Sequence, residues 1–542
     1  MANFSSLKLN HYLFLIIIVH FINLCAVQSI MAQTDPDYPN IIFMIADDLG
    51  VDYFNGYHDS DLLPNTPTLD SIRAKGITFE NCFSTPMCTS SRATVMSGKH
   101  GIKTGVLSPP GNLDLEHKSI FTALEELTNN TYSDAVIGKW HISQPINPLH
   151  PSEHSIDYYT GLLGASVEDY YAWQKTENGI TTTENTYVTQ YLTDRAIEWI
   201  EDQNQPWFCW FAHAAPHSPF HVPPAELHTV NAPTNNKRKF VAMVEAIDHE
   251  LNRLLNTIPQ EVKDNTIFIF IGDNGTPTSL IQDYPVGHGK ATLYQGGIRV
   301  PMIVAGAGVT RQGERESALL HINDIYATIL DIAGANLPGG IHNSLSFAHL
   351  LNGEIGDTRS YNYTDFEEGN TPTFAIRDKR YKLIDYQNGV QEFFDLQQDS
   401  LEFNNLLLSS LTPEELLIKS ELETEADFRR TGWSCNDHIQ NGDETGIDCG
   451  GSHCLTCISS ASETDSDTNV VIYPNPTYDI IKINSDVDIN KIKLFSVSGQ
   501  LIKTIKTKAK SIVVDLSTEL SQELIIEIHL ADKVVRKHVF KL

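Results

Sequence analysis

The fold is decided by the stretch Asn40-Ile41-Ile42-Phe43-Met44-Ile45-Ala46-Asp47-Asp48-Leu49-Gly50. The six residues after Asn40 form a continuous apolar run, which is typical of a strand buried on both faces of a parallel sheet. Two adjacent carboxylates, Asp47 and Asp48, follow this run. Because ligand sites of open α/β sheets form at the carboxyl ends of parallel strands, the stretch predicts an α/β fold and a site at this edge of the sheet.

A second buried strand ends in side chains of the same kind. Residues 265–271, which include the apolar run 267–271, are expected to form another buried strand, and Asp273 and Asn274 follow it. Adjacent carboxylates repel each other, so a bound cation is the usual remedy, and ligation by oxygen alone indicates calcium or magnesium. A single Asp-Asp pair could instead belong to a solvated acidic turn that binds no cation. Two strand ends with such pairs are a more specific signal, and together they predict an oxygen-lined cation site.

Residues 85–98 place a cysteine, several hydroxyl side chains and an arginine at the opening of a segment with helical spacing. A helix N-terminus offers unpaired N–H groups and a positive dipole end, which suits a tetrahedral anion. A nucleophile at Cys88 would face a sulfate or phosphate held by this turn, and Arg92 can add a planar two-pronged donor. The alternative is a small buried cysteine in an ordinary junction between a loop and a helix.

Two further strands lead into basic side chains. Residues 133–138 form a short strand, and Lys139 and His141 follow it. Residues two apart in an extended segment point the same way, so one of the pair could neutralise a sulfate oxygen while the other moves a proton. The alternative is that residues 139–141 form an exposed turn without a role in a site. The apolar run 207–212 leads in the same manner to His217.

The composition narrows the class of protein. The chain has 542 residues, a hydrophobic share of 41% and a charged share of 20%, which are typical of a soluble globular protein with two or three domains. Its formal net charge of −30 argues against nucleic acid or an anionic membrane as a partner, since these need a basic face. An anionic substrate must therefore be recognised by a local basic pocket.

Two segments indicate the cellular compartment of the protein. Residues 1–32 read as a secretory signal peptide with cleavage before Gln33, and their apolar run is short for a membrane span. Four cysteines cluster near the other end of the chain, at Cys435, Cys449, Cys454 and Cys457. Because disulfides persist in an exported protein, we expect two bridges there rather than a zinc site.

These motifs together resemble those of the type I, formylglycine-dependent sulfatases of the alkaline phosphatase superfamily. The resemblance rests first on Cys88-x-x-Ser91-Arg92, in a family whose cysteine is oxidised after translation to formylglycine. Ser90 stands where the family usually has Pro or Ala. The Asp47-Asp48 pair is similar to the first metal motif of the family.

Later motifs follow the family order as well. Residues 216–219 match its Pro-His-x-Pro motif, which includes His217. Residues 289–301 resemble its closing motif, which places Lys290 in the pocket and has Gln295 where Glu is common. The likeness extends over about residues 38–430, which is most of the mature chain.

The resemblance implies a mechanism of sulfate ester hydrolysis. One Ca²⁺ would be held by Asp47, Asp48, Asp273, Asn274 and Cys88 in its oxidised form. The hydrate of formylglycine 88 would attack sulfur and leave a covalent sulfo-enzyme. His217 and Lys290 would neutralise or protonate the departing sugar oxygen, and His141 would then take a proton from the second hydroxyl and so expel sulfate. Lys139 and Arg92 would orient residue 88 and bind the sulfate oxygens.

The resemblance also predicts the organisation of the chain. We expect a large mixed, mostly parallel sheet flanked by helices, and then a small α+β subdomain with an antiparallel sheet. The motif Tyr473-Pro474-Asn475-Pro476 opens a run of short alternating strands that resembles a type IX secretion sorting domain, with an ordinary β-sandwich module as the alternative. The expected bounds are 1–32 for the signal peptide, 33–345 for the catalytic domain, 346–430 for its C-terminal subdomain, 431–458 for a cysteine-rich module, 459–469 for a linker and 470–542 for the all-β sorting domain.

The implied function is that of an exported sulfatase, which is secreted or attached to the cell surface after transit through the periplasm. The sorting domain indicates a degrader of polysaccharides, with algal ulvan, carrageenan or fucoidan, or animal glycosaminoglycans, as the substrate. The expected partners are this glycan, a formylglycine-generating or anaerobic sulfatase-maturating enzyme and the type IX machinery, with no nucleic acid. A phosphate or phosphonate monoester hydrolase of the same superfamily and a non-catalytic glycan-binding relative are the alternatives.

Overall fold

The computed structural model of the chain describes most residues between Tyr38 and Thr431 and five segments beyond residue 469. The described residues are 38–58, 60–143, 147–335, 337, 341–369, 371–431, 470–473, 480–496, 501–516, 523–530 and 534–540. The predicted signal peptide, the four clustered cysteines and the linker lie outside these residues. The chain divides into two compact units, Met1–Gly442 and Asp443–Leu542.

The first unit is built on a sheet of ten strands in its described residues, with β1 (Asn40–Ala46) at the centre. Every residue of β1 is buried, and the strand pairs in parallel with β7 (Trp207–Ala212) and β8 (Thr266–Gly272). Phe43 lies opposite Trp210 on one side and Ile269 on the other. The continuous apolar run therefore forms the doubly covered central strand that the sequence predicts.

The remaining strands make the sheet a mixed one. Its order is β10 (Glu314–His321), β2 (Gly76–Phe83), β9 (Met302–Gly306), β8, β1, β7, β3 (Ser133–Gly138), β4 (Tyr158–Gly161), β5 (Trp173–Glu177) and β6 (Ile180–Glu184). The strands β9, β5 and β6 run antiparallel to their neighbours, whereas β3, β7, β1 and β8 are parallel. The mixed α/β fold predicted from the sequence is confirmed, and its parallel centre aligns the carboxyl ends of four strands.

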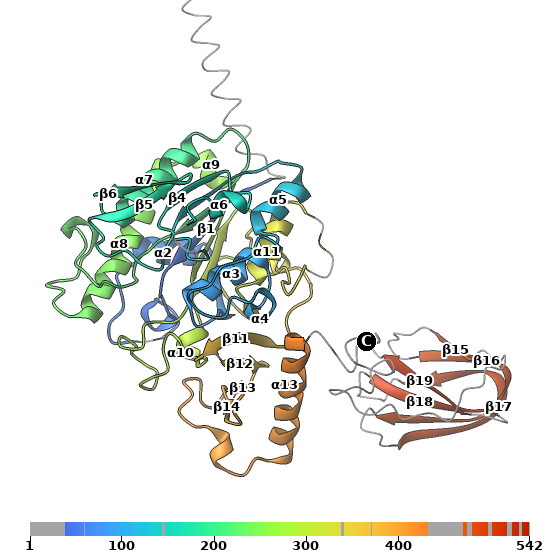
Figure 1. Cartoon of the computed structure of the whole chain (residues 1–542). Helices are drawn as coiled ribbons and strands as arrows, with labels where there is room; N and C mark the ends of the chain where they lie inside the picture. The colour runs from blue at the N-terminus through green and yellow to red at the C-terminus, as the bar shows by residue number, and fades with distance from the viewer. Residues whose placement is uncertain are drawn as a thin grey trace, which may run out of the picture. The chain divides into compact units, whose positions relative to one another are not determined.

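Helices cover both faces of this sheet (Figure 1). Successive side chains of β1 point to opposite faces, so Phe43 belongs to one core and Met44 to the other. The first core is completed by α3 (Cys88–Ser97), α5 (Ile120–Thr128) and α11 (Asp324–Ile332). The second is completed by α2 (Pro67–Ala74), α7 (Val188–Glu201) and α8 (Asn236–Thr257). The short helices are α4 (Gly101–Thr104), α6 (His150–Glu153), α9 (Gln260–Asp264), α10 (Gln295–Ile298) and α12 (Ala348–Asn352), with 3₁₀ turns at Val51–Tyr53, Ala225–Leu227 and Leu406–Leu408.

A small antiparallel sheet completes the first unit. It has the order β11 (Asn362–Glu368), β12 (Thr371–Arg377), β13 (Tyr381–Asp385) and β14 (Gln391–Asp395), and α13 (Pro413–Thr431) packs on it through the buried Leu422 and Ala426. A buried ion pair joins Lys382 Nζ to Glu402 Oε1 at 2.6 Å. The other oxygen of Glu402 accepts a hydrogen bond from Gln295 N at 2.5 Å, so this carboxylate ties the small sheet to α10.

The second unit is an antiparallel sheet with its own apolar core in its described segments. Its strands are β15 (Val470–Tyr473), β16 (Ile480–Ser496), β17 (Leu501–Asp515), β18 (Glu523–His529) and β19 (Val534–Phe540). The expected strands were short, but β16 and β17 are 17 and 15 residues long. Register shifts between Asn484 and Ile489 let the pair continue past an irregularity instead of ending there. No helix in the described part of the chain combines the length and apolar character needed to cross a membrane.

Two buried histidines make the stability of the first unit depend on pH. His213 follows β7 and His321 ends β10, and both rings are buried. Burial lowers the pKa of His213 to about 3. Burial, assisted by the charge of Arg359, also lowers the pKa of His321 to about 3. Both side chains are therefore neutral in the folded protein at neutral pH.

We predict that the free energy of unfolding decreases as the pH falls below about 6.5, the pKa of an exposed histidine. In that range the unfolded chain binds protons that the folded chain excludes, which costs up to ~1.4 kcal/mol per pH unit for each histidine. Urea unfolding between pH 7.5 and 5 measures this slope, and His213→Asn and His321→Asn should each make it shallower. Slopes unchanged from that of the original protein would contradict the prediction.

Candidate active site

Four acidic or amide side chains meet where the central parallel strands end. Asp47 and Asp48 follow β1, Asp273 and Asn274 follow β8, and all four are buried. Asp48 N donates to Asp273 Oδ1 at 2.9 Å, and Asn274 Nδ2 donates to Asp48 Oδ1 at 2.9 Å. The structure thus brings together the two strand ends that the sequence singles out. Asp48 adopts a φ of 73°, a left-handed conformation that turns the chain at this edge.

The oxygens of this cluster suit a divalent cation. Ligand atoms of Asp47, Asp48 and His217 lie within 4.8 Å of one another. Asp47 Oδ1 and Asn274 Oδ1 are buried acceptors that find no hydrogen-bond donor among the described residues. A buried acceptor without a donor is costly, whereas an oxygen in that position is a natural ligand of calcium. The donor set therefore fits the hard cation expected from the sequence.

Three cationic side chains surround the carboxylates. Lys139 Nζ pairs with Asp47 and Lys290 Nζ with Asp48. Arg92 Nη2 lies 2.8 Å from Asp273 Oδ2 and 3.9 Å from Asp47 Oδ2, so it bridges the two strand ends. Burial opposes ionisation of Asp47, but Lys139 and other nearby cations outweigh it and lower the pKa of this carboxyl. Burial and the charge of Asp47 raise the pKa of Asp273 to about 7.

Cys88 opens α3 beside this cluster. Its side chain is buried, and Cys88 Sγ lies 3.2 Å from His141 Nδ1. Burial raises the pKa of the Cys88 thiol, although Lys139 and Lys290 oppose the shift. Burial, with Lys139 and Arg92, lowers the pKa of His141 to about 2, so the imidazole is neutral and able to accept a proton.

The path of the chain from Lys139 to His141 differs from the extended segment expected. β3 ends at Gly138, and His141 adopts a left-handed φ of 53°. The side chains consequently do not follow the alternation of a strand, because Lys139 pairs with Asp47 whereas His141 contacts Cys88. The segment is therefore not extended as expected, although both side chains reach the same site.

Several contacts of the site carry no signal in the sequence. Thr89 Oγ1 lies 3.0 Å from His141 Nε2, and Tyr170 Oη donates to the carbonyl oxygen of His217 at 2.7 Å. Ser90 Oγ lies 2.7 Å from Thr85 Oγ1 and donates to a backbone carbonyl at 3.0 Å. Ser90, which departs from the family motif, is therefore held in a hydroxyl network at the start of α3. Only the tertiary arrangement could identify these partners.

An acidic cluster at the carboxyl ends of parallel strands, with a cysteine at a helix N-terminus beside a neutral imidazole, is an arrangement that suits the hydrolysis of anionic esters. The family model described as "Sulfatase" matches residues 39–335, more than half of the chain. The chain therefore belongs to the sulfatase family and is a sulfuric ester hydrolase.

Known proteins extend this comparison. Arylsulfatase J of Mus musculus is 31% identical over an alignment of 321 residues that covers 54% of this chain and 52% of that protein, so the chain matches about half of that relative's length. The ulvan-active sulfatase of Formosa agariphila is 23% identical over an alignment of 436 residues that covers 71% of this chain and 78% of that protein. The crystal structure of Ps i-CgsB in complex with k-i-k-neocarrahexaose superposes with a TM-score of 0.62 at 24% identity, over 73% of this chain and 95% of that chain. This last likeness shows a shared fold.

Two other family models match later parts of the chain. The model described as "N-sulphoglucosamine sulphohydrolase, C-terminal" matches residues 287–426, which include the small antiparallel sheet. The model described as "Secretion system C-terminal sorting domain" matches residues 471–522. The second match confirms the type IX sorting domain recognised in the sequence and indicates export by that route.

Proposed function

We propose that this sulfatase hydrolyses sulfate esters on a sulfated polysaccharide or its oligosaccharides, with Cys88 oxidised to formylglycine and one bound Ca²⁺. The observation that carries the proposal is the position of residue 88. It opens a buried helix, lies 3.2 Å from a neutral imidazole and adjoins a cluster of carboxylates whose charges are met by lysine and arginine.

The calcium ion would be held by Asp47, Asp48, Asp273 and Asn274, together with the oxygen of the oxidised residue 88. The fit rests on the unpartnered oxygens of Asp47 and Asn274. When bound, the ion supplies positive charge that offsets the charge of the sulfate and of the nucleophilic oxygen. His217 is expected to remain outside the coordination shell, since oxygen ligands suit this ion better than imidazole.

The basic side chains differ in exposure, and this suggests different roles. The side chains of Lys139 and Arg92 are 0% and 1% exposed and are held by carboxylates, so they orient the deep end of the site. The side chains of His217 and Lys290 are 16% and 14% exposed, so they can reach a sugar at the mouth. These two would therefore neutralise or protonate the departing sugar oxygen.

His141 would act on residue 88 itself. Its Nδ1 faces the side chain of residue 88, and Thr89 Oγ1 at 3.0 Å from Nε2 can fix the plane of the ring. As a neutral base, it can accept a proton from a hydroxyl of the hydrated residue 88, the step in which sulfate is released. Arg92, which donates to the carbonyl oxygen of Lys139 at 2.8 Å, fixes the backbone that leads to this histidine.

A polysaccharide substrate is supported by two comparisons. One relative is described as an ulvan-active sulfatase, and the similar fold of Ps i-CgsB was determined with a neocarrahexaose. The sorting domain indicates export, which would place the enzyme where such glycans occur, either secreted or attached to the cell surface. We propose a sulfated algal polysaccharide, with maturation of Cys88 by a formylglycine-generating or anaerobic sulfatase-maturating enzyme.

The test is the release of free sulfate from ulvan, ι-carrageenan, fucoidan and chondroitin sulfate, and from oligosaccharides of each. The protein is co-expressed with a maturation enzyme, and peptide mass establishes formylglycine at residue 88 before the assay. We expect release from one glycan class and none from phosphate or phosphonate monoesters. Release of phosphate alone would favour the phosphohydrolase alternative, and retention of these glycans without turnover would favour a non-catalytic relative.

A further inference from the structure

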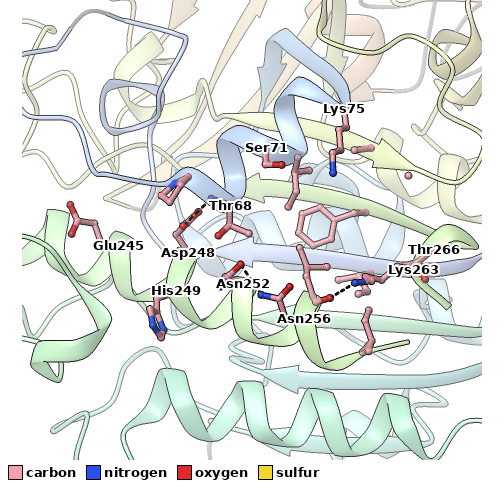
Figure 2. A pocket seen from close by; sticks show the side chains of 18 of the residues that line it. Thr68, Ser71, Lys75, Glu245, Asp248, His249, Asn252, Asn256, Lys263 and Thr266 are labelled. Atoms are coloured by element: carbon pink, nitrogen blue, oxygen red, sulfur yellow. Dashed lines mark hydrogen bonds between the residues drawn. The ribbon is translucent and has the colours of Figure 1, made fainter. Parts of the chain in front are cut away.

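A large cavity lies away from the active site. It has a volume of about 880 Å³ and lies between α2 and α8, and no residue of the active-site cluster lines it. Ile42 and Phe268, from the first halves of β1 and β8, line it from the sheet side. Figure 2 shows α2 along one wall and α8 along the other. The active-site residues follow the opposite, carboxyl ends of the same strands.

The carboxylates at one end of the cavity are already used by the fold. Asp248 accepts hydrogen bonds from the backbone N–H groups of Thr68 at 3.1 Å and Leu69 at 2.7 Å, in the first turn of α2. Glu245 accepts from the backbone N–H groups of Asn65 at 3.0 Å and Thr229 at 2.5 Å. These two acids therefore anchor backbone segments, and they lie together at one side of the view in Figure 2.

The other end carries two ammonium groups. The side chains of Lys75 and Lys263 project into the cavity there (Figure 2). Lys263 Nζ donates to Leu255 O at 2.7 Å, which leaves two further donors, and neither lysine forms an ion pair with a carboxylate of the described chain. Asp264, also at this end, accepts from Gln260 at 2.6 Å. An anionic group would find unpaired positive charge at this end.

The remaining walls offer groups that suit sugar hydroxyls. Ser71 from α2 faces the amides of Asn252 and Asn256 from α8 across an apolar floor (Figure 2). Both ring nitrogens of His228, which also lines the cavity, are buried and find no hydrogen-bond partner among the described residues. Amides and hydroxyls beside an apolar surface satisfy the polar edge and the apolar face of a sugar ring at once.

We propose that this cavity, called the groove below, is a second, non-catalytic glycan site, which binds a sulfated sugar unit with its sulfate at Lys75 and Lys263. The inference rests on the proposed function, since the ligand would be another part of the polysaccharide that the active site hydrolyses. Two sites on one chain raise the local concentration of substrate, so the groove would favour long polymers over short esters.

The test measures binding without turnover, in the full chain with Cys88→Ala. Electrophoresis through gels that contain ι-carrageenan or ulvan gives the affinity for the polymer, and chemically desulfated polymer and inorganic sulfate separate the contributions of sugar and sulfate. The double variant Lys75→Glu/Lys263→Glu, and Ser71→Trp, which fills the groove, should each weaken binding at least fivefold. Lys379→Glu reverses the charge of one exposed lysine of the small subdomain and should leave binding unchanged.

A second readout uses the enzyme with an intact Cys88. The groove variants should lower kcat/KM for the polymer about as much as they lower its binding, and leave kcat/KM for 4-nitrophenyl sulfate unchanged. The inference would be overturned if the groove variants bound the polymer as tightly as the Lys379→Glu control, or if neither polymer retarded the Cys88→Ala protein in the gel. If the groove variants weakened binding but the protein released no sulfate, the glycan site would be supported and the proposed function would be rejected.

Discussion

Replacing Cys88 with alanine is expected to reduce sulfate release by roughly 100,000-fold or more, because it removes the nucleophile on which the other side chains act. Cys88 Sγ lies 3.2 Å from His141 Nδ1, and the neutral imidazole has its pKa lowered to about 2 by burial and nearby cations. The measurement is free sulfate released under saturating substrate, from protein whose residue 88 has been characterised by peptide mass.

The matched control for this prediction is Cys209→Ala. Cys209 is an equally buried thiol in the middle of β7, and the same atoms are removed at a position remote from the strand ends. We expect this control to keep its activity and to lose about 1 kcal/mol of the free energy of unfolding. Full activity of Cys88→Ala would show that another residue is the nucleophile. Thr89, whose Oγ1 also contacts His141, would be the first residue to replace.

Calcium is expected to stabilise the protein as well as to support turnover. At a concentration about 1,000 times the dissociation constant, a ligand of the folded state adds about 4 kcal/mol to the free energy of unfolding. Asp47→Asn should abolish this response, since it removes the charge of a carboxylate whose Oδ1 has no donor among the described residues. Activity should fall at least about 1,000-fold in this variant and after chelation. Thermal unfolding with and without calcium measures the first effect.

A nearby carboxylate provides the control for the calcium experiment. Asp52 is buried, but its oxygens are taken by Thr276 Oγ1 at 2.5 Å and by Gln282 N at 3.1 Å. Asp52→Asn should therefore keep the increase of the unfolding temperature on addition of calcium. A response lost equally in both variants would show that general destabilisation, and not a lost ligand, explains the result for Asp47→Asn. A calcium response preserved in Asp47→Asn would place the ion elsewhere.

The charge of Asp47 has a second consequence for the interpretation of that variant. Lys139 is fully buried and pairs with Asp47, so Asp47→Asn leaves a buried ammonium without its partner. Breaking a buried pair in this way costs about 3–5 kcal/mol. Comparison at equal fractions folded, rather than at equal temperature, separates this cost from the loss of calcium binding.

Much of the fold follows from local patterns. The continuous apolar runs predicted β1, β7 and β8, and the structure confirms each of them to within a residue. The start of α3 at Cys88 was also predicted, because the motif is followed by helical spacing. These features depend on neighbouring residues, and periodicity along the chain reports burial directly.

The partners within the site depend on the order of the strands. Arg92 pairs with Asp273 across 181 positions of sequence, and Asn274 bonds to Asp48 across 226. The sequence could indicate that such residue types belong to one site, through their order and their resemblance to a family. It could not indicate which cation meets which carboxylate.

By itself, therefore, the sequence determined the class of fold, the family, the sorting domain and the set of candidate residues, because each can be recognised from local apolar runs and motifs. The tertiary structure alone decided that His141 turns to Cys88 through a left-handed backbone while Lys139 turns to Asp47. It alone placed Lys75 and Lys263 at one end of a groove. Contacts between distant segments follow from how strands and helices pack in space, which no periodicity along the chain encodes.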